Sequence, residues 1–309
     1  MKILYSLFFN IIASVLLILF LSCKTNSVDK IATNACLLEK FIYENGSEET
    51  FEHDSEDRLI KHIVYEKSIK RTSTRVYDYD LDGKVIKETE IFSDDVNNPF
   101  ITEFKYNSKG LLIAIGTNCI NLFYDQDDKL SYVTYEDGGI EYYSNDELIK
   151  KVDQNKITNI LTYEKVGNYD VTTVTSKNYI AKYYYYDGNL FKKNIDDGSP
   201  TYLANYTYDA YIRPTIPSVS KKGWPIAFYK YHPPLKSISK HGTSCSDNYY
   251  RDLKSSKNNL IQETVNGKIV ASYKYEYNKN DYPTVEIAER SYASSIPSEP
   301  IKYFYKNCQ

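Results

Sequence analysis

The sequence predicts an all-β protein, a long antiparallel meander of repeated hairpins that is twisted and curled into an open or partly closed barrel-like sheet. Short alternating stretches rich in Tyr, Thr, Val and Ile follow one another after residue 25, with no long helical period. Asn-Gly and Asp-Gly dipeptides separate these stretches and favour the positive φ of tight hairpin turns. The chain also contains 33 tyrosines, and those beside turns recur at a fixed spacing from an aliphatic residue.

That spacing defines a seven-residue unit, in which an aromatic residue stands six positions before an aliphatic one and a polar turn lies between them. Its clearest copy is Tyr79-Asp-Leu-Asp-Gly-Lys-Val85, and further copies begin at His53, Tyr106, Tyr124, Tyr142 and Tyr184. In a hairpin the aromatic and aliphatic side chains meet across the strands, which contributes about 0.2–1 kcal/mol. A single hairpin is not stable alone, so the copies are expected to stack side by side in one sheet.

One segment breaks this pattern. Residues 211–246 contain five prolines and the only tryptophan, Trp224. Proline cannot donate to a strand ladder, so we expect an irregular insertion here, with the regular pattern resuming at Ser272. Residues 36–309 are otherwise expected to form a single β domain.

The N-terminus is typical of an exported lipoprotein. Lys2 precedes an apolar run from Ile3 to Leu21, and Ser22-Cys23 follows. We predict that residues 1–22 are a signal peptide, that Cys23 carries the lipid (acyl chains such as palmitate), and that residues 23–35 are a tether. Each buried CH₂ group would contribute about 0.8 kcal/mol to anchoring. The alternative is an uncleaved transmembrane anchor, since the apolar run is nearly long enough to span a bilayer.

Four cysteines remain after Cys23, namely Cys36, Cys119, Cys245 and Cys308. An even number in an exported chain predicts two disulfides, and three pairings are possible. The cysteine spacings match no CxxC metal or redox pattern. The alternative to two disulfides is that these cysteines are free buried thiols.

The chain resembles the Bacteroidota-type lipoproteins built from YD-like repeats, which are related in pattern to RHS/YD-repeat proteins. The Leu21-Ser-Cys-Lys24 lipobox, Cys36 at the start of the body and the Tyr79–Val85 turn carry the resemblance. Ser256-Lys-Asn-Asn259 and the segment from Tyr273 to Pro283 add to it, although Asp281 stands where such segments often have Gly. The resemblance implies a β-rich fold and a cell-envelope location, and it implies no activity and no site residues.

No catalytic residue, metal site or cofactor is predicted. Gly-x-Ser-x-Gly, HExxH, Walker and GxGxxG motifs are absent from the sequence. Asp78, Asp80 and Asp82 resemble the opening of a calcium loop, but Thr89, flanked by Glu88 and Glu90, occupies the position of its last ligand. Turn hydrogen bonding therefore explains these aspartates better than calcium does. His232 and His241 lie near Cys245, but at no standard zinc spacing.

A formal charge of −3 argues against nucleic acid as a partner, since no broad basic field attracts it. Four consecutive tyrosines in a strand must point to both faces. With the tryptophan, they form a candidate exposed aromatic patch consisting of Tyr183, Tyr184, Tyr185, Tyr186 and Trp224.

The predicted function is that of a non-enzymatic, lipid-anchored cell-envelope scaffold or binding module. Its expected partners are the membrane, through the lipid, and envelope proteins or glycans. In the outer membrane, the periplasmic face is favoured over the surface because no acidic cluster follows Cys23. The alternatives are a glycan-binding accessory lipoprotein and a hydrolase with an unidentified carboxylate pair.

Overall fold

A computed structural model describes residues 36–116, 119–198, 202–212, 220–222, 258–291, 299–306 and 308. Residues Cys36–Lys306 form one compact unit. The other unit, residues 1–35 with 307–309, contributes only Cys308 to the described part of the chain. The predicted signal peptide, Cys23 and the tether therefore lie outside the described residues.

The described residues contain twenty β-strands and no helix, so no helix there could cross a membrane. The first ten strands are β1 Leu37–Ile42, β2 Glu48–His53, β3 Leu59–Glu66, β4 Arg71–Tyr79, β5 Val85–Phe92, β6 Asp95–Tyr106, β7 Leu112–Ile115, β8 Ile120–Tyr124, β9 Leu130–Tyr135 and β10 Ile140–Ser144. The others are β11 Glu147–Val152, β12 Thr158–Val166, β13 Tyr169–Thr175, β14 Ile180–Tyr186, β15 Asn189–Asp196, β16 Tyr202–Ile212, β17 Asn258–Val265, β18 Lys268–Tyr277, β19 Pro283–Arg290 and β20 Ile301–Lys306.

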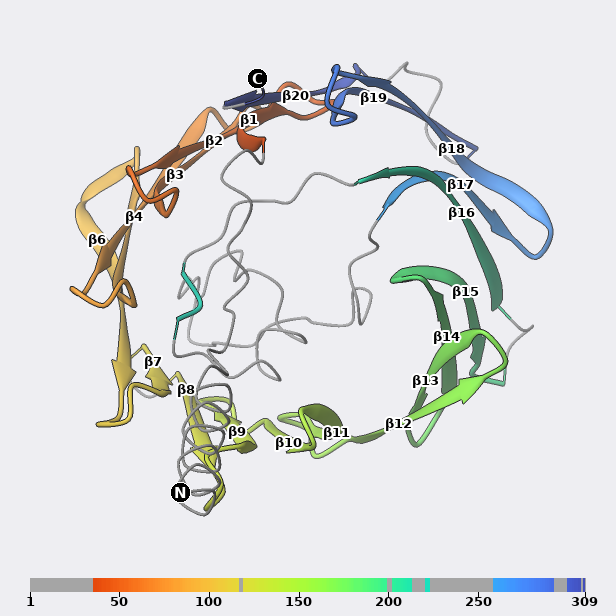
Figure 1. Cartoon of the computed structure of the whole chain (residues 1–309), viewed down its shortest axis with the longest axis horizontal. Helices are drawn as coiled ribbons and strands as arrows, with labels where there is room; N and C mark the ends of the chain where they lie inside the picture. The colour runs from red at the N-terminus through yellow and green to blue at the C-terminus, as the bar shows by residue number, and fades with distance from the viewer. Residues whose placement is uncertain are drawn as a thin grey trace, which may run out of the picture. The chain divides into compact units, whose positions relative to one another are not determined.

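The sheet closes into a ring. Each strand pairs antiparallel with the next along the chain, and β20 pairs with β1, where Leu38 lies opposite Tyr305 and Phe41 opposite Tyr303 (Figure 1). The predicted all-β meander is confirmed, and the barrel is fully closed. Among the described strands, closure leaves no edge on which another chain could add.

Six of the turns share one hydrogen-bonding pattern. In the turn after β4, the Asp80 carboxylate oxygen Oδ1 accepts the Lys84 N–H at 2.8 Å, and Gly83 adopts a φ of +78°. The equivalent bonds are accepted by Asp54, Asn107, Asp125, Asp153 and Asn278. Asp281 takes the left-handed position itself, with a φ of +62°, which explains how this turn forms without the expected glycine. Local turn chemistry thus uses Asp80, and the described residues contain no group of side chains suited to a metal ion.

A second recurring contact joins several repeats to their predecessors. Tyr79 at the end of β4 donates its hydroxyl to the carbonyl oxygen of Leu59, the first residue of β3, at 2.6 Å. Tyr106 does the same to Val85 at 2.9 Å. We call this contact the tyrosine clasp. Five further clasps join Tyr124 to Leu112, Tyr163 to Leu148, Tyr208 to Leu190, Tyr275 to Leu260 and Tyr305 to Pro283.

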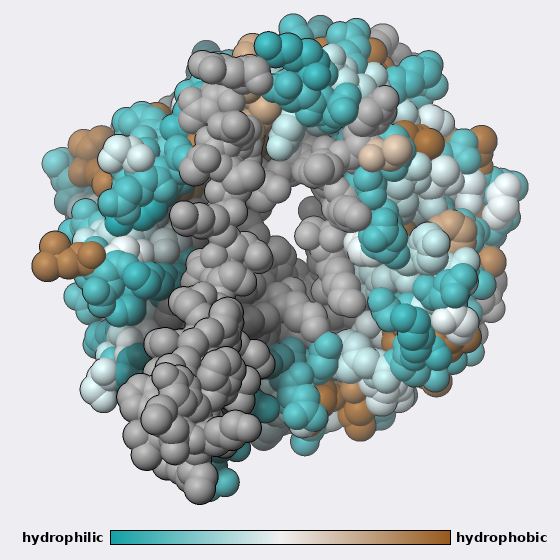
Figure 2. Space-filling view, in the orientation of Figure 1, coloured by the Kyte–Doolittle hydropathy of each residue, from teal (hydrophilic) through white to brown (hydrophobic). Residues whose placement is uncertain are grey.

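The clasps lie on the inner face of the ring. Residues 220–222, the teal segment inside the ring in Figure 1, contact Tyr79, so Tyr79 and the residues that share its face of β4 point inward. The aliphatic residues that follow the turns are fully buried on this side, as Val85 and Leu112 show. The described surface mixes hydrophilic residues with scattered exposed apolar ones such as Val76 and Ile101 (Figure 2).

The predicted insertion has different boundaries in the structure. Strand β16 continues to Ile212, which pairs with Asn258 at the start of β17. Tyr211 and Ile212 of the predicted insertion 211–246 therefore belong to β16, β17 begins before Ser272, and residues 213–219 and 223–257 lie outside the described residues. The early start of β17 was missed because Asn258 and Asn259 are poor strand formers that are held by side-chain bonds to Asn189 and Asp209.

Two of the three possible cysteine pairings are excluded. A disulfide joins Cys36 to Cys308. Cys119 is also disulfide-bonded, and Cys245 lies outside the described residues.

We predict that Tyr106→Phe lowers the free energy of unfolding by about 1 kcal/mol, because the buried Val85 carbonyl loses its donor. Urea denaturation measures this change. The matched control is Tyr132→Phe, an outer-face tyrosine that makes no clasp, which should leave stability within about 0.5 kcal/mol. Equal effects of the two substitutions would contradict a stabilising role for the clasp.

Candidate functional site: an inner charged row and an outer aromatic cluster

Charged side chains form a row across neighbouring strands on the inner face. His62 of β3 lies opposite Arg75 of β4, which lies opposite Glu90 of β5. Arg75 is four residues before Tyr79 on the same strand, so the two side chains share the inner face. Glu49 of β2 extends the row at one end, and Glu88 lies two residues before Glu90. All five residues are buried.

The row is held by contacts of Glu90 with Arg75 and of Glu49 with His62. Glu90 Oε1 accepts from Arg75 Nη2 at 2.9 Å and from Nε at 3.1 Å. Glu49 Oε2 lies 2.8 Å from His62 Nε2, and Phe51 stacks on the His62 ring with 4.7 Å between ring centroids. Each buried charge therefore has an opposite or polar partner, as burial demands.

Glu88 is the least well compensated acid of the row. Burial raises its pKa from 4.5 to about 7, and Arg75, whose Nε is 3.9 Å from Glu88 Oε1, opposes that rise only in part. The guanidinium is shared, because its closer bonds go to Glu90. At neutral pH the site can therefore take up or release a proton at Glu88.

A second buried carboxylate with a basic partner, Glu141, lies on β10. Glu141 of β10 pairs with Lys151 Nζ at 2.9 Å. It also accepts the hydroxyls of Tyr135 at 2.9 Å and Tyr143 at 2.8 Å. Burial raises the pKa of Tyr143 well above its usual value, so this hydroxyl stays protonated and donates.

Sequence reasoning missed these residues as a site. Glu88 and Glu90 attracted notice only as neighbours of Thr89 in a calcium-loop comparison. Their signal is the spacing of two within a strand, which places both carboxylates on one face. Spacing alone does not show which face of the sheet is buried. From the sequence, Glu88 and Glu90 therefore look the same as Asp78 and Asp80, which have the same spacing at the end of β4.

The tyrosine run divides between the two faces, and this corrects the predicted patch. Tyr183 and Tyr185 are 7% and 1% exposed and belong to the core, because strand alternation turns them inward. Tyr184 is half-buried and Tyr186 is 53% exposed on the outer face. Trp224 lies outside the described residues.

The two outward tyrosines belong to an outer aromatic cluster, which we define as Tyr169, Tyr184, Tyr186 and Phe191. The Tyr169 ring lies 6.4 Å from Tyr184, 6.1 Å from Tyr186 and 5.7 Å from Phe191, measured between centroids. Val171, opposite Tyr184 in the sheet, is only 2% exposed beneath them. The cluster therefore offers ring faces over an apolar base, with the Lys192 ammonium 5.3 Å from the centre of the Tyr184 ring.

Comparison with known proteins finds no matching family model. The chain is 31% identical over 156 residues, half of its length, to a protein of Bacillus spizizenii named tRNA3(Ser)-specific nuclease WapA, and it spans 6% of that relative. Among solved structures, a porin-like protein from Bacteroides uniformis has a TM-score of 0.38 and 12% identity, covering 87% of this chain and 98% of that one. A TcdB2-TccC3 structure has a TM-score of 0.27 and 15% identity, covering 74% of this chain and 12% of that one.

We predict that stability falls as pH rises from about 5 to 8 and that Glu88→Gln removes part of this fall. The folded chain holds the Glu88 proton up to about pH 7, whereas the unfolded chain releases it near 4.5, so raising the pH between these values favours unfolding. The contribution is at most about 3 kcal/mol. Thermal unfolding at each pH measures it, with the exposed Glu39→Gln as control. A wild-type profile that the Glu88 variant reproduces unchanged would refute the assignment.

Proposed function

We propose that the chain is a non-enzymatic binding scaffold of the cell envelope, anchored by a lipid on Cys23. The observation that carries this proposal is the closed ring, in which successive repeats are clasped together and the buried ionisable groups are paired with one another. Such a shell offers a rigid surface for a partner. Nuclease activity is not part of the proposal, because the chain corresponds to only 6% of the relative that bears that name.

The envelope location rests on the sequence. The Leu21-Ser22-Cys23 lipobox supports lipid attachment, and the lack of an acidic cluster after Cys23 favours the periplasmic face of the outer membrane. Disulfide bonding of Cys36, Cys119 and Cys308 supports an oxidising compartment, which agrees with export.

Glycan binding is the second candidate, and the outer aromatic cluster favours it. Tyr186 and Phe191 are 53% and 43% exposed, so their ring faces are accessible to a sugar ring, and the tyrosine hydroxyls supply hydrogen bonds at its edge. The hydrolase alternative has less support. Its best carboxylate pair, Glu88 and Glu90, is 6% and 2% exposed and shares Arg75.

Lipid attachment predicts that the wild-type chain incorporates a palmitate analogue in cells and sediments with outer membranes. Cys23→Ala should abolish both, because the modified thiol is gone. Thr25→Ala, a nearby substitution that leaves Cys23 and the disulfide-bonded cysteines in place, is the control. Continued labelling of the Cys23 variant would exclude the anchor. Protease treatment of intact cells then distinguishes the periplasmic face, which is protected, from the surface.

Glycan binding predicts a saturable change in tyrosine fluorescence when the soluble domain is titrated with envelope polysaccharides. Tyr186→Ala should weaken binding about fivefold, since stacking contributes on the order of 1 kcal/mol per ring. Phe304→Ala, an equally exposed aromatic on β20 outside the cluster, should change nothing. A flat response to every glycan, with recovery of a protein partner by cross-linking in cells, favours the scaffold instead.

A further inference from the structure

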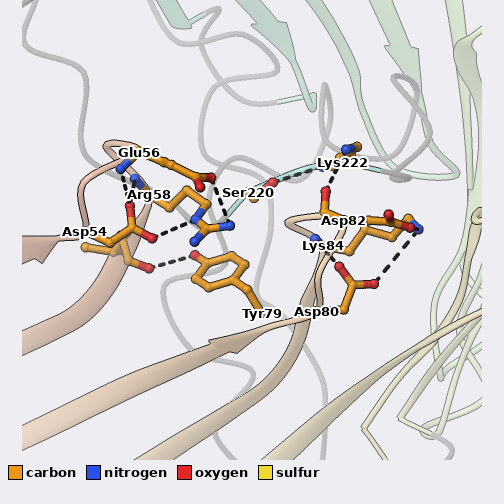
Figure 3. Close-up of polar contacts among 10 residues, drawn as sticks. Asp54, Glu56, Arg58, Tyr79, Asp80, Asp82, Lys84, Ser220 and Lys222 are labelled. Carbon is orange, nitrogen blue, oxygen red and sulfur yellow. Dashed lines mark hydrogen bonds and ion pairs between the residues drawn. The ribbon is translucent and has the colours of Figure 1, made fainter.

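A short segment of the insertion is seated on two neighbouring turns of the ring (Figure 3). The Ser220 backbone N–H donates to the Tyr79 hydroxyl. Lys222 Nζ donates to the Asp82 carbonyl oxygen at 2.6 Å, as the dashed line in Figure 3 shows. Asp82 belongs to the turn between β4 and β5, while Tyr79 is the last residue of β4. The contact thus uses a backbone donor and an ammonium group, two residues apart, against two fixed acceptors.

Contacts other than those with the segment hold the Tyr79 side chain in place. Its hydroxyl donates to the Leu59 carbonyl at 2.6 Å in the tyrosine clasp, which leaves the oxygen lone pairs free to accept. The Arg58 guanidinium lies 5.0 Å from the centre of the ring. Asp54 holds that guanidinium at 2.7 Å and Glu56 at 3.2 Å, so the turn between β2 and β3 orients the acceptor.

The contact joins parts of the ring that are not neighbours. The segment follows β16, which lies eight strands from β4 in one direction around the twenty described strands and twelve in the other. Ile212 ends β16 and pairs with Asn258, so β16 and β17 are neighbours in the sheet through their own ladder of hydrogen bonds. The bond to Tyr79 is therefore a separate attachment, and the ladder of strands does not impose it.

Charge favours the same attachment. Residues 213–257 contain nine lysines and arginines against two aspartates, whereas the two turns carry Asp54, Glu56, Asp80 and Asp82. The Lys84 ammonium lowers the pKa of Asp82, and Lys222 lowers it further, so this carboxylate is ionised and attracts the segment. Opposite charges on the two parts stabilise their association at low ionic strength.

We propose that the turns Asp54–Arg58 and Asp80–Lys84 form a docking site for a lysine-bearing peptide segment, and that the chain's own Ser220–Lys222 occupies it. Tyr79 is the residue that links docking to the sheet, because one hydroxyl closes the clasp and receives the segment. Recognition requires an N–H donor followed two residues later by lysine. Docking goes beyond the scaffold function proposed above, and it holds whether or not the chain binds an external partner.

Tyr79→Phe tests the link, with Tyr106→Phe as the matched control. Both variants lose one clasp, but Tyr106 makes its clasp to Val85 and lies in the next repeat. We expect the Ser220 amide to exchange hydrogen about tenfold faster in Tyr79→Phe only, because its acceptor is gone. Trypsin cleavage after Lys221 and Lys222 should accelerate in the same variant. Equal exchange and cleavage in the two variants would overturn the proposal.

Lys222→Met provides a second test that spares the sheet, since Lys222 is exposed and makes no ladder contact. The substitution keeps the apolar stem and removes the ammonium that bonds Asp82. Ser220 exchange should rise while the melting temperature stays within about 1 °C of wild type, because a surface substitution has little effect on the fold. Lys177→Met, an exposed lysine in the loop before β14, should leave Ser220 unchanged. Unaltered Ser220 exchange in Lys222→Met would also overturn the proposal.

Discussion

The hydrogen bond from a tyrosine hydroxyl to the carbonyl of the aliphatic residue that ends the preceding seven-residue unit stabilises the joints between repeats. The strand ladder satisfies backbone groups within each hairpin, but the register shifts beside the turns, as between Asp78 and Tyr79, interrupt that ladder. A tyrosine side chain is long enough to reach the aliphatic residue beside such a shift. Its ring packs against that buried residue, and its hydroxyl donates to the residue's carbonyl oxygen, as Tyr106 does to Val85. One residue type thus meets the packing and the polar requirement of the same joint.

Closure of the ring sets the environment of the charged groups. With β20 paired to β1, residues such as Arg75, Glu88 and Glu90 lie on a face that is withdrawn from bulk water. Burial then raises the pKa of Glu88 to about 7 and leaves Arg75 divided between two carboxylates. These buried charges pair with one another inside the ring. The accessible chemistry lies elsewhere, on the outer aromatic cluster and on the two acidic turns that hold Ser220–Lys222.

In both accessible sites, features that the fold requires also present groups at the surface. The outer aromatic cluster lies on β13 to β15, where alternation that buries Tyr183 and Tyr185 must expose Tyr184 and Tyr186. The docking turns owe their shape to the Asx hydrogen bonds of Asp54 and Asp80. In both cases a feature required for folding presents groups at the surface at no further conformational cost, and a repeat protein can carry several such features around one ring.

The amino-acid sequence by itself determined the strands and the turns, because their chemistry is local. Asp80 with Gly83, or Asn266 with Gly267, specifies a turn through a side-chain bond or a positive φ within a few residues. Only the tertiary structure decided closure, the inward face and the docking of Ser220. Strands β1 and β20 come from opposite ends of the domain's sequence, although they pair in the sheet. Which face Glu88 occupies depends on registers and bulges accumulated over many strands. Alternation reveals two faces, but only the closed ring makes one of them the interior.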